Sequence, residues 1–138
     1  MLELTETPCQ SDSIAIFHAL EEVTARVAGR TQFRPLAVLL RDDSGTVAGG
    51  LWGSTYYSWL SITMIFVPES LRRCGIGSAM VSLAEEAARE RGCIGAQVDA
   101  YDFQAAGFYE RLGFKVFGVQ DNHPPGHRRL YFAKPLCA

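Results

Sequence analysis

Two stretches of the chain repeat apolar residues at the spacing of an α-helix. In the first, the polar residues 10–13 precede an apolar stripe that Gly29 ends. This stripe consists of Ile14, Phe17, Leu20, Val23 and Val27. In the second, an amphipathic helix is expected to begin after Gly75 and to end at Gly92, which supplies a left-handed stop. Its apolar face is predicted to hold Ile76, Ala79, Met80, Leu83, Ala84 and Ala87, and its solvent face Ser82, Glu85, Glu86, Arg89 and Glu90.

The rest of the pattern is that of β-strands separated by turns. Short apolar or alternating runs predict strands at residues 2–5, 36–40, 46–55, 60–67, 94–98, 114–119 and 129–133. A short helix is expected at residues 103–112, and Gly49, Gly50 and Gly53 indicate a bulge or a close approach of two backbones. The three strands before the long helix should form an antiparallel meander. The element order therefore predicts an α/β (α+β) fold, a mixed and mostly antiparallel sheet flanked by helices.

Length and composition narrow the class of protein. A chain of 138 residues suits one domain, so we expect residues 1–138 to form a single domain. A net charge of −2 provides no basic field for nucleic acid or a membrane surface, and no apolar run approaches the roughly 20 residues of a spanning helix. The first residues lack the pattern of a secretory signal. Cys9, Cys74, Cys93 and Cys137 are scattered without metal-ligand spacing, so we expect reduced thiols, no metal site and a cytoplasmic protein.

The clearest chemical signal is the link between the strand that ends at Pro68 and the long helix. Its sequence, RRCGIG at residues 72–77, fits the pattern [RQ]-x-x-G-x-[GA]. Glycines let a large anion approach the backbone, and the free N–H groups at a helix start favour phosphate. The segment lacks the third glycine of a dinucleotide fingerprint and the lysine of a P-loop. We therefore expect a pyrophosphate to be bound by Arg72, Arg73, Cys74, Gly75, Ile76, Gly77 and Ser78.

A second motif, FQAAGFYERLGF at residues 103–114, follows at a fitting distance. Together the two motifs resemble the GNAT superfamily of acetyl-CoA-dependent N-acetyltransferases, and the resemblance runs from about residue 46 to residue 132. It implies transfer of an acetyl group from acetyl-CoA to a primary amine of a small molecule or peptide, by direct attack in a ternary complex. It also implies that the pantetheine arm pairs with Ile65, Phe66 and Val67, where the strand diverges from its neighbour. Gln104 and Phe108 are further cofactor-binding residues on the same grounds.

Tyr109 is the predicted general acid, because it occupies the tyrosine position of the family's A-x-x-[FL]-Y-x-x-x-G-F motif. When an amine displaces CoA, the leaving sulfur gains negative charge, and a nearby phenol can donate a proton. Many members of the family use a glutamate on the preceding strand as the general base, but residues 60–67 contain no acidic residue. The base is left open between water and the side chains of Asp99, Asp102, Asp121, His123 and His127.

Two other functions compete with acetyl transfer. A non-catalytic acyl-CoA-binding sensor or partner domain is supported by the missing strand glutamate. A flavin- or mononucleotide-binding domain is disfavoured, because such folds start with a parallel βαβ unit and not with an antiparallel meander. The resemblance also implies a homodimer formed through late strands, where Phe114, Phe117, Tyr131 and Phe132 leave apolar surface to cover. Trp52, Tyr56, Tyr57 and Trp59 are candidates to line an acceptor or dimer surface.

Overall fold

The computed structural model describes residues 1–104 and 107–136, and the chain divides into two compact units, Met1–Gln32 and Phe33–Ala138. The first unit contains α1 (Gln10–Ala28), which begins where the backbone N–H of Cys9 donates to the Asp12 carboxylate at 3.0 Å. After the helix, Glu21 accepts hydrogen bonds from the N–H and the hydroxyl of Thr31 at 3.0 and 2.9 Å. The expected strand at residues 2–5 is wrong, since residues 1–9, all of them described, form no strand. A strand needs a partner for its backbone groups, and this unit offers none in its described residues.

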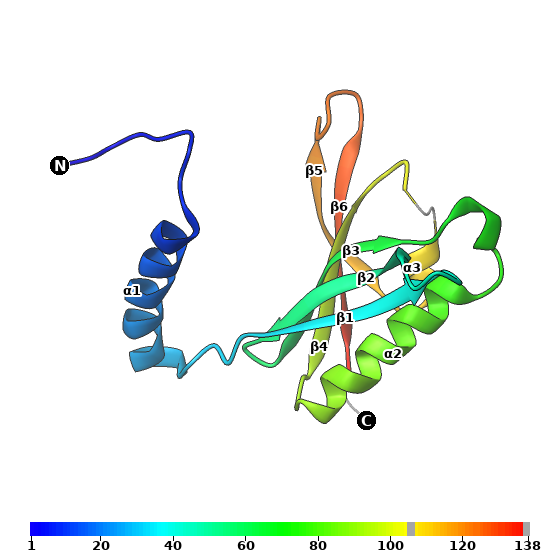
Figure 1. Ribbon diagram of the computed structural model, residues 1–138, viewed down its shortest axis with the longest axis horizontal. Coiled ribbons are helices and arrows are strands. Elements are labelled where there is room, and N and C mark those ends of the chain that lie inside the picture. The colour runs from blue at the N-terminus through cyan, green and yellow to red at the C-terminus, as the bar shows by residue number, and fades with distance from the viewer. Residues whose placement is uncertain (105–106, 137–138) are drawn as a thin grey trace. The chain divides into compact units, whose positions relative to one another are not determined.

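The second unit is built on a six-stranded sheet (Figure 1). Its strands are β1 (Arg34–Arg41), β2 (Val47–Tyr56), β3 (Trp59–Phe66), β4 (Gly95–Tyr101), β5 (Lys115–Asp121) and β6 (Arg128–Pro135). They lie in the order β1-β2-β3-β4-β6-β5. Only β3 and β4 pair in parallel among these strands, because the long helix crosses over between them, and the other pairs are antiparallel. The predicted mixed, mostly antiparallel sheet is therefore confirmed.

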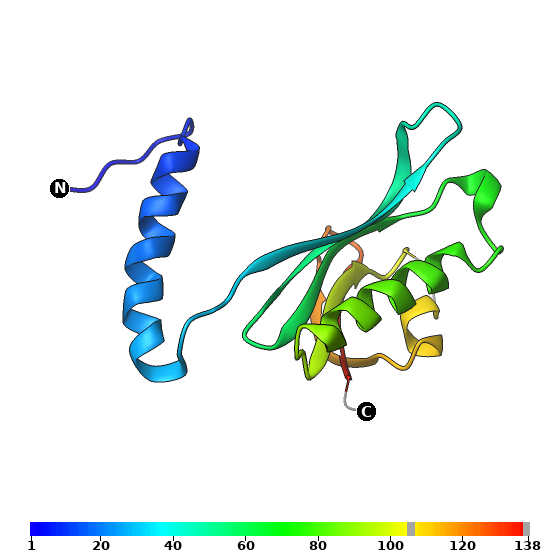
Figure 2. The same cartoon turned by 60° about the horizontal axis from the view of Figure 1, so that its bottom comes forward.

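Three helical segments connect these strands: η1 (Glu69–Leu71), α2 (Ile76–Glu90) and α3 (Phe108–Arg111). Helix α2 lies along one face of the sheet and contacts β1, β2 and β3 (Figure 2). Between them lies the core, whose largest fully buried side chains are Phe114, Leu51, Leu60, Leu136 and Val81. Gly92 ends the helix in the predicted left-handed conformation, with a φ of 83°. The helix and its stop thus follow the sequence pattern.

The predicted faces of α2 are partly wrong. The buried residues are Met80, Val81, Ala84, Glu85 and Ala88, whereas Leu83 is 55% exposed. Several alanines make the apolar face ambiguous from sequence. Packing on the sheet and the ion pair between Glu85 and Lys134 determine which face of the helix is buried. Lys134 of β6 places its Nζ 3.0 and 2.9 Å from the two carboxylate oxygens of Glu85, which satisfies that acidic side chain in the interior.

Three glycines of β2 bear on the site. Gly49, Gly50 and Gly53 lie against the backbone of neighbouring strands, where an added Cβ would collide with the carbonyl oxygens of Phe66, Val38 and Ser61 respectively. The close backbone approach predicted from these glycines is therefore confirmed.

The last predicted helix, in contrast, is shorter than residues 103–112. The described part begins at Phe108, residues 105–106 lie outside the described residues, and Gln104 belongs to a turn in which its N–H donates to the Tyr101 carbonyl at 2.9 Å.

Candidate active site

The parallel strands β3 and β4 separate in the middle of the sheet. Their pairing runs from Trp59 opposite Gly95 to Ile62 opposite Val98 and ends there, although β3 continues to Phe66 and β4 to Tyr101. Next to this point the β2–β3 register shifts, which leaves Thr63 as an extra residue on β3. Such a bulge bends a strand and interrupts its ladder. The far half of β3 therefore presents backbone N–H and C=O groups toward an opening between the two strands, where an extended ligand can pair with them.

The glycine loop follows directly from this half of β3. Arg73 and Gly75 both adopt left-handed backbone conformations, with φ of 65° and 79°, and α2 begins at Ile76. The first N–H groups of a helix have no partner within the helix, and here Gly75 and Gly77 carry no side chain that would block an approach to them. The Arg72 side chain is fixed beside the residue that follows β3, because its Nε donates to the Val67 carbonyl at 2.9 Å. The loop thus has the backbone donors and the positive helix end that favour an anion.

Gly77 brings the two sequence motifs together. A Cβ added at this glycine would lie 3.2 Å from both Cε1 and Cζ of Phe108 and 3.6 Å from Cγ2 of Val67. The first turn of α2 therefore packs directly on α3 and on the residue after β3. Gln104 is placed differently from Phe108, since its Oε1 accepts a hydrogen bond from the backbone N–H of Tyr101 at 2.9 Å. Of the two residues expected from the second motif, Phe108 is the one that contacts the glycine loop.

Tyr109 of α3 is buried, with 4% of its surface exposed. Its ring packs against Phe114 and Phe132, with centroid distances of 5.8 and 5.4 Å. Burial raises the pKa of Tyr109 to about 12, and the negative charge of Asp99 adds to this effect. None of the described residues hydrogen bonds to its hydroxyl, yet none of their fully buried polar atoms is unpaired. With this pKa the phenol is neutral at pH 7 and keeps its proton available for donation.

Comparison with known proteins agrees with this geometry. The sequence model of the Acetyltransferase (GNAT) family matches residues 6–114, which is most of the chain. The chain belongs to the GNAT family. It is 41% identical over 107 residues to the blasticidin-S acetyltransferase of Streptomyces morookaense, covering 75% of this chain and 79% of that protein. The chain is thus an acetyltransferase enzyme.

Solved structures give the same fold. The crystal structure of a protein from Agrobacterium tumefaciens matches with a TM-score of 0.89 at 32% identity, over 98% of both chains. An aminoglycoside 6'-N-acetyltransferase complexed with coenzyme A matches with a TM-score of 0.64 at 19% identity, over 75% of this chain and 74% of that one. At that identity the second match shows the fold alone.

The candidate bases of this acetyltransferase gather where β4 meets the connection between β5 and β6. Asp99 binds Arg129, whose Nε and Nη2 lie 2.9 and 2.6 Å from Oδ1. Asp102 accepts from the backbone N–H of Arg128 at 3.0 Å and lies 3.1 Å from Nδ1 of His127. The remaining candidates are His123, whose Nδ1 lies 2.8 Å from the Gln120 Oε1, and Asp121 at the exposed end of β5. Sequence reasoning missed Arg129, because its pairing with Asp99 depends on the β4–β6 register.

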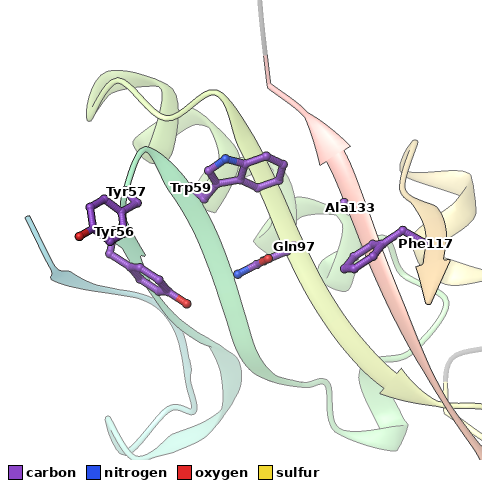
Figure 3. A pocket seen from close by; sticks show the side chains of 6 residues that line it. All are labelled: Tyr56, Tyr57, Trp59, Gln97, Phe117 and Ala133. Atoms are coloured by element: carbon purple, nitrogen blue, oxygen red, sulfur yellow. The ribbon is translucent and has the colours of Figure 1, made fainter. Parts of the chain in front are cut away.

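A pocket of about 400 Å³ lies further along the sheet. It is lined by Tyr56, Tyr57, Trp59, Gln97, Phe117 and Ala133, which come from neighbouring strands and the turn that joins two of them (Figure 3). Three of the four aromatic residues expected to line a surface are among these. Within the described residues no group of three or more His, Cys, Asp or Glu side chains is arranged to hold a metal ion. No helix in the same part of the chain has the length and apolar character needed to cross a membrane.

Proposed function

We propose that this enzyme binds acetyl-CoA along the diverging half of β3 and acetylates the amine of a small molecule. The observation that carries the proposal is the continuous path from the unpaired backbone of β3, through the glycine loop, to the start of α2. In this assignment the pantetheine arm pairs with Ile65, Phe66 and Val67. The pyrophosphate binds the N–H groups of residues 73–78, and the exposed Arg73 side chain adds positive charge.

Tyr109 is the general acid in this proposal. The neutral amine attacks the thioester carbonyl carbon, so a C–N bond forms and the C–S bond then breaks. The electron pair of that bond stays on sulfur, which takes a proton from the Tyr109 hydroxyl. The nitrogen loses one proton, which returns to the Tyr109 oxygen through water. The products are an acetamide and the thiol of CoA, and Tyr109 ends in its starting state.

No acyl-enzyme is part of this mechanism. Cys74 lies in the glycine loop, where its thiol donates to the Arg72 carbonyl at 3.6 Å, and Cys93 is buried. Neither cysteine is placed beside the Tyr109 ring by any contact among the described residues. The ternary-complex route therefore needs no nucleophile other than the amine.

A small molecule is the proposed acceptor because of the relatives. The blasticidin-S acetyltransferase, at 41% identity, is named for a small amine-bearing compound. The acceptor in this chain is accordingly an amine of that size, and acetyl is the proposed acyl group. The homodimer, the cytoplasmic location and the single domain over residues 1–138 stay predictions; light scattering across a wide concentration range would measure the first. Of the four aromatic residues expected to leave apolar surface for a dimer, Phe114 and Phe132 are instead buried in the core.

The test combines binding with turnover. Acetyl-CoA should raise the melting temperature of the protein and FMN should not, because a ligand of the folded state stabilises it by mass action. Release of free thiol from acetyl-CoA is then measured with blasticidin S, an aminoglycoside and a short peptide as acceptors. Thiol release with a small amine supports the proposal. Binding of acetyl-CoA with no release for any amine would favour the sensor function, and release with the peptide alone would overturn the acceptor class.

A further inference from the structure

Asp99 occupies a particular position on β4. It is the first residue after Val98, where the pairing with β3 ends. Val98 and Ala100 on either side are buried, whereas Asp99 is exposed. Since side chains alternate along a strand, Asp99 points to the face of the sheet opposite the core. Asp99 therefore lies beside the point at which β3 and β4 part, with its carboxylate on that face of the sheet and paired with Arg129 of β6.

The carboxylate also lies near the proposed general acid. Burial is the main cause of the raised pKa of Tyr109, and the charge of Asp99 contributes further in the same direction. The Tyr109 ring packs against Phe132, and Phe132 pairs across the sheet with Val98, the residue before Asp99. Tyr109 and Asp99 therefore lie near the same part of β4, Tyr109 on the core side and Asp99 on the opposite face.

The ion pair with Arg129 involves only one of the two carboxylate oxygens of Asp99, Oδ1. Both guanidinium nitrogens donate to Oδ1, and among the described residues Oδ2 has no hydrogen-bond partner. The side chain of Asp99 is 41% exposed, so Oδ2 is accessible. Arg129 is itself placed over the Tyr101 ring, 5.9 Å from its centroid, which fixes the orientation of the pair. By contrast, Asp102 uses both oxygens, one toward His127 and one for the Arg128 N–H.

We propose that Oδ2 of Asp99 binds the acceptor amine and stabilises the positive charge that its nitrogen acquires during attack on the thioester. This inference rests on the proposed function and deepens it. When a neutral amine forms the C–N bond, the nitrogen becomes cationic until it loses a proton, so a fixed carboxylate beside it stabilises that state more than the ground state. The proton itself leaves through water, because carboxylic acids, with a reference pKa of about 3.9, hold a proton poorly compared with alkyl amines at about 10.4.

The role also explains how the enzyme functions without a glutamate on β3. An anion contributed by β4 takes the place beside the nitrogen, and Arg129 from β6 orients it through an ion pair. The acceptor class that fits is an amine that is cationic in water, since such an amine is attracted to the carboxylate before it loses a proton. Amines on neutral or anionic aromatic compounds, which are weakly basic, should be poor substrates.

The test compares Asp99→Asn with Asp43→Asn, which makes the same change in the exposed β1–β2 turn. The acceptor is whichever of blasticidin S and the aminoglycoside the wild type acetylates faster. We expect kcat/KM for the amine to fall about 10-fold to 150-fold in Asp99→Asn, the range for a hydrogen bond to a charged group. The melting-temperature shift with acetyl-CoA should match that of the wild type, and Asp43→Asn should not change either value.

Equal kcat/KM in the two variants would overturn the assignment of Asp99. An equal loss of acetyl-CoA binding and of turnover in Asp99→Asn would also overturn it, because it would indicate a structural role. If Asp99→Asn does not fold, Asp99→Glu replaces it; this change keeps the charge and should preserve acetyl-CoA binding while lowering kcat/KM. A wild type that binds acetyl-CoA but acetylates no amine contradicts the proposed function itself, and that result is seen before any variant is made.

Discussion

Replacement of Tyr109 by phenylalanine separates the chemical step from folding. The change removes one oxygen from a ring that is 4% exposed and keeps the contacts with Phe114 and Phe132. Because none of the described residues hydrogen bonds to the hydroxyl, no polar partner is left unpaired in the interior. We therefore expect the free energy of unfolding at neutral pH to change by less than about 1 kcal/mol.

The loss of turnover follows from the acid strength of the phenol. General acids contribute about 100-fold to 10,000-fold to a rate, which is about 2.7 to 5.4 kcal/mol of transition-state stabilisation. The raised pKa of Tyr109, about 12, makes it a weaker acid than a thiol with a reference pKa of about 8.5. Proton transfer to the sulfur is therefore unfavourable until the nitrogen proton returns to the Tyr109 oxygen, so in the transition state the phenol stabilises the sulfur mainly through a hydrogen bond as charge develops. We expect the loss in kcat to lie nearer 100-fold.

The assay measures kcat by thiol release and the affinity for acetyl-CoA by calorimetry, in the wild type and in Tyr109→Phe. The matched control is Tyr131→Phe, which removes a hydroxyl that donates to Gln120 at 2.9 Å on the neighbouring strand. The control should keep normal kcat. Equal kcat in Tyr109→Phe and the wild type would refute the acid assignment, and a large loss of acetyl-CoA affinity with normal kcat would make Tyr109 a binding residue.

Three further predictions concern the loop, pH and the interior ion pair. Gly77→Val should abolish the melting-temperature shift with acetyl-CoA, because even a Cβ at this position would lie 3.2 Å from Phe108 and the larger side chain would displace the loop. An unchanged shift would contradict the assignment of the glycine loop as the pyrophosphate site. The folded state holds the Tyr109 proton more tightly than the unfolded state, so the free energy of unfolding is constant below about pH 10 and falls by up to about 3 kcal/mol toward pH 12. Denaturant unfolding of Tyr109→Phe should lack this loss. Lys134→Met should cost about 3 kcal/mol, because the buried Glu85 carboxylate then keeps only the more distant Arg89 guanidinium, 3.9 Å away, as an ion-pair partner. Glu85→Leu combined with Lys134→Met should cost less, and additive losses in a double-mutant cycle would argue against the pair.

The sequence predicts the sheet well because its signals are local. Alternating apolar residues and glycine-containing turns define five of the six strands of the described sheet within two residues at each end, and the sixth, β4, continues three residues further than expected at its carboxyl end. The glycine loop is also local, since Arg73 and Gly75 turn the chain immediately before α2. The failures involve partners far apart in the chain. The rotation of α2 depends on a lysine 49 positions after Glu85, which no periodicity reveals.

The same distinction explains what could be predicted of the site. The residues around Gly77 and Tyr109 lie in two contiguous motifs, so a resemblance to a family is enough to suggest them. Asp99 could be named only as one of several acidic candidates. Its selection required the point at which β3 and β4 part and the β4–β6 register that brings Arg129, 30 positions away, onto one of its oxygens. Geometry of this kind comes from tertiary structure alone.

The Glu85–Lys134 pair joins the two halves of the site as well as filling the interior. Glu85 belongs to α2, which begins with the glycine loop, and the Lys134 ammonium donates both to that carboxylate and to the Leu112 carbonyl at 2.7 Å, directly after α3. A half-buried lysine that joins α2 to the residue after α3 in this way helps to fix the distance between the proposed pyrophosphate site and Tyr109. The sequence could replace the pair by apolar residues at little cost in stability, as buried pairs often allow. Its retention of the charged bridge is therefore consistent with a requirement for a fixed geometry between donor and acid.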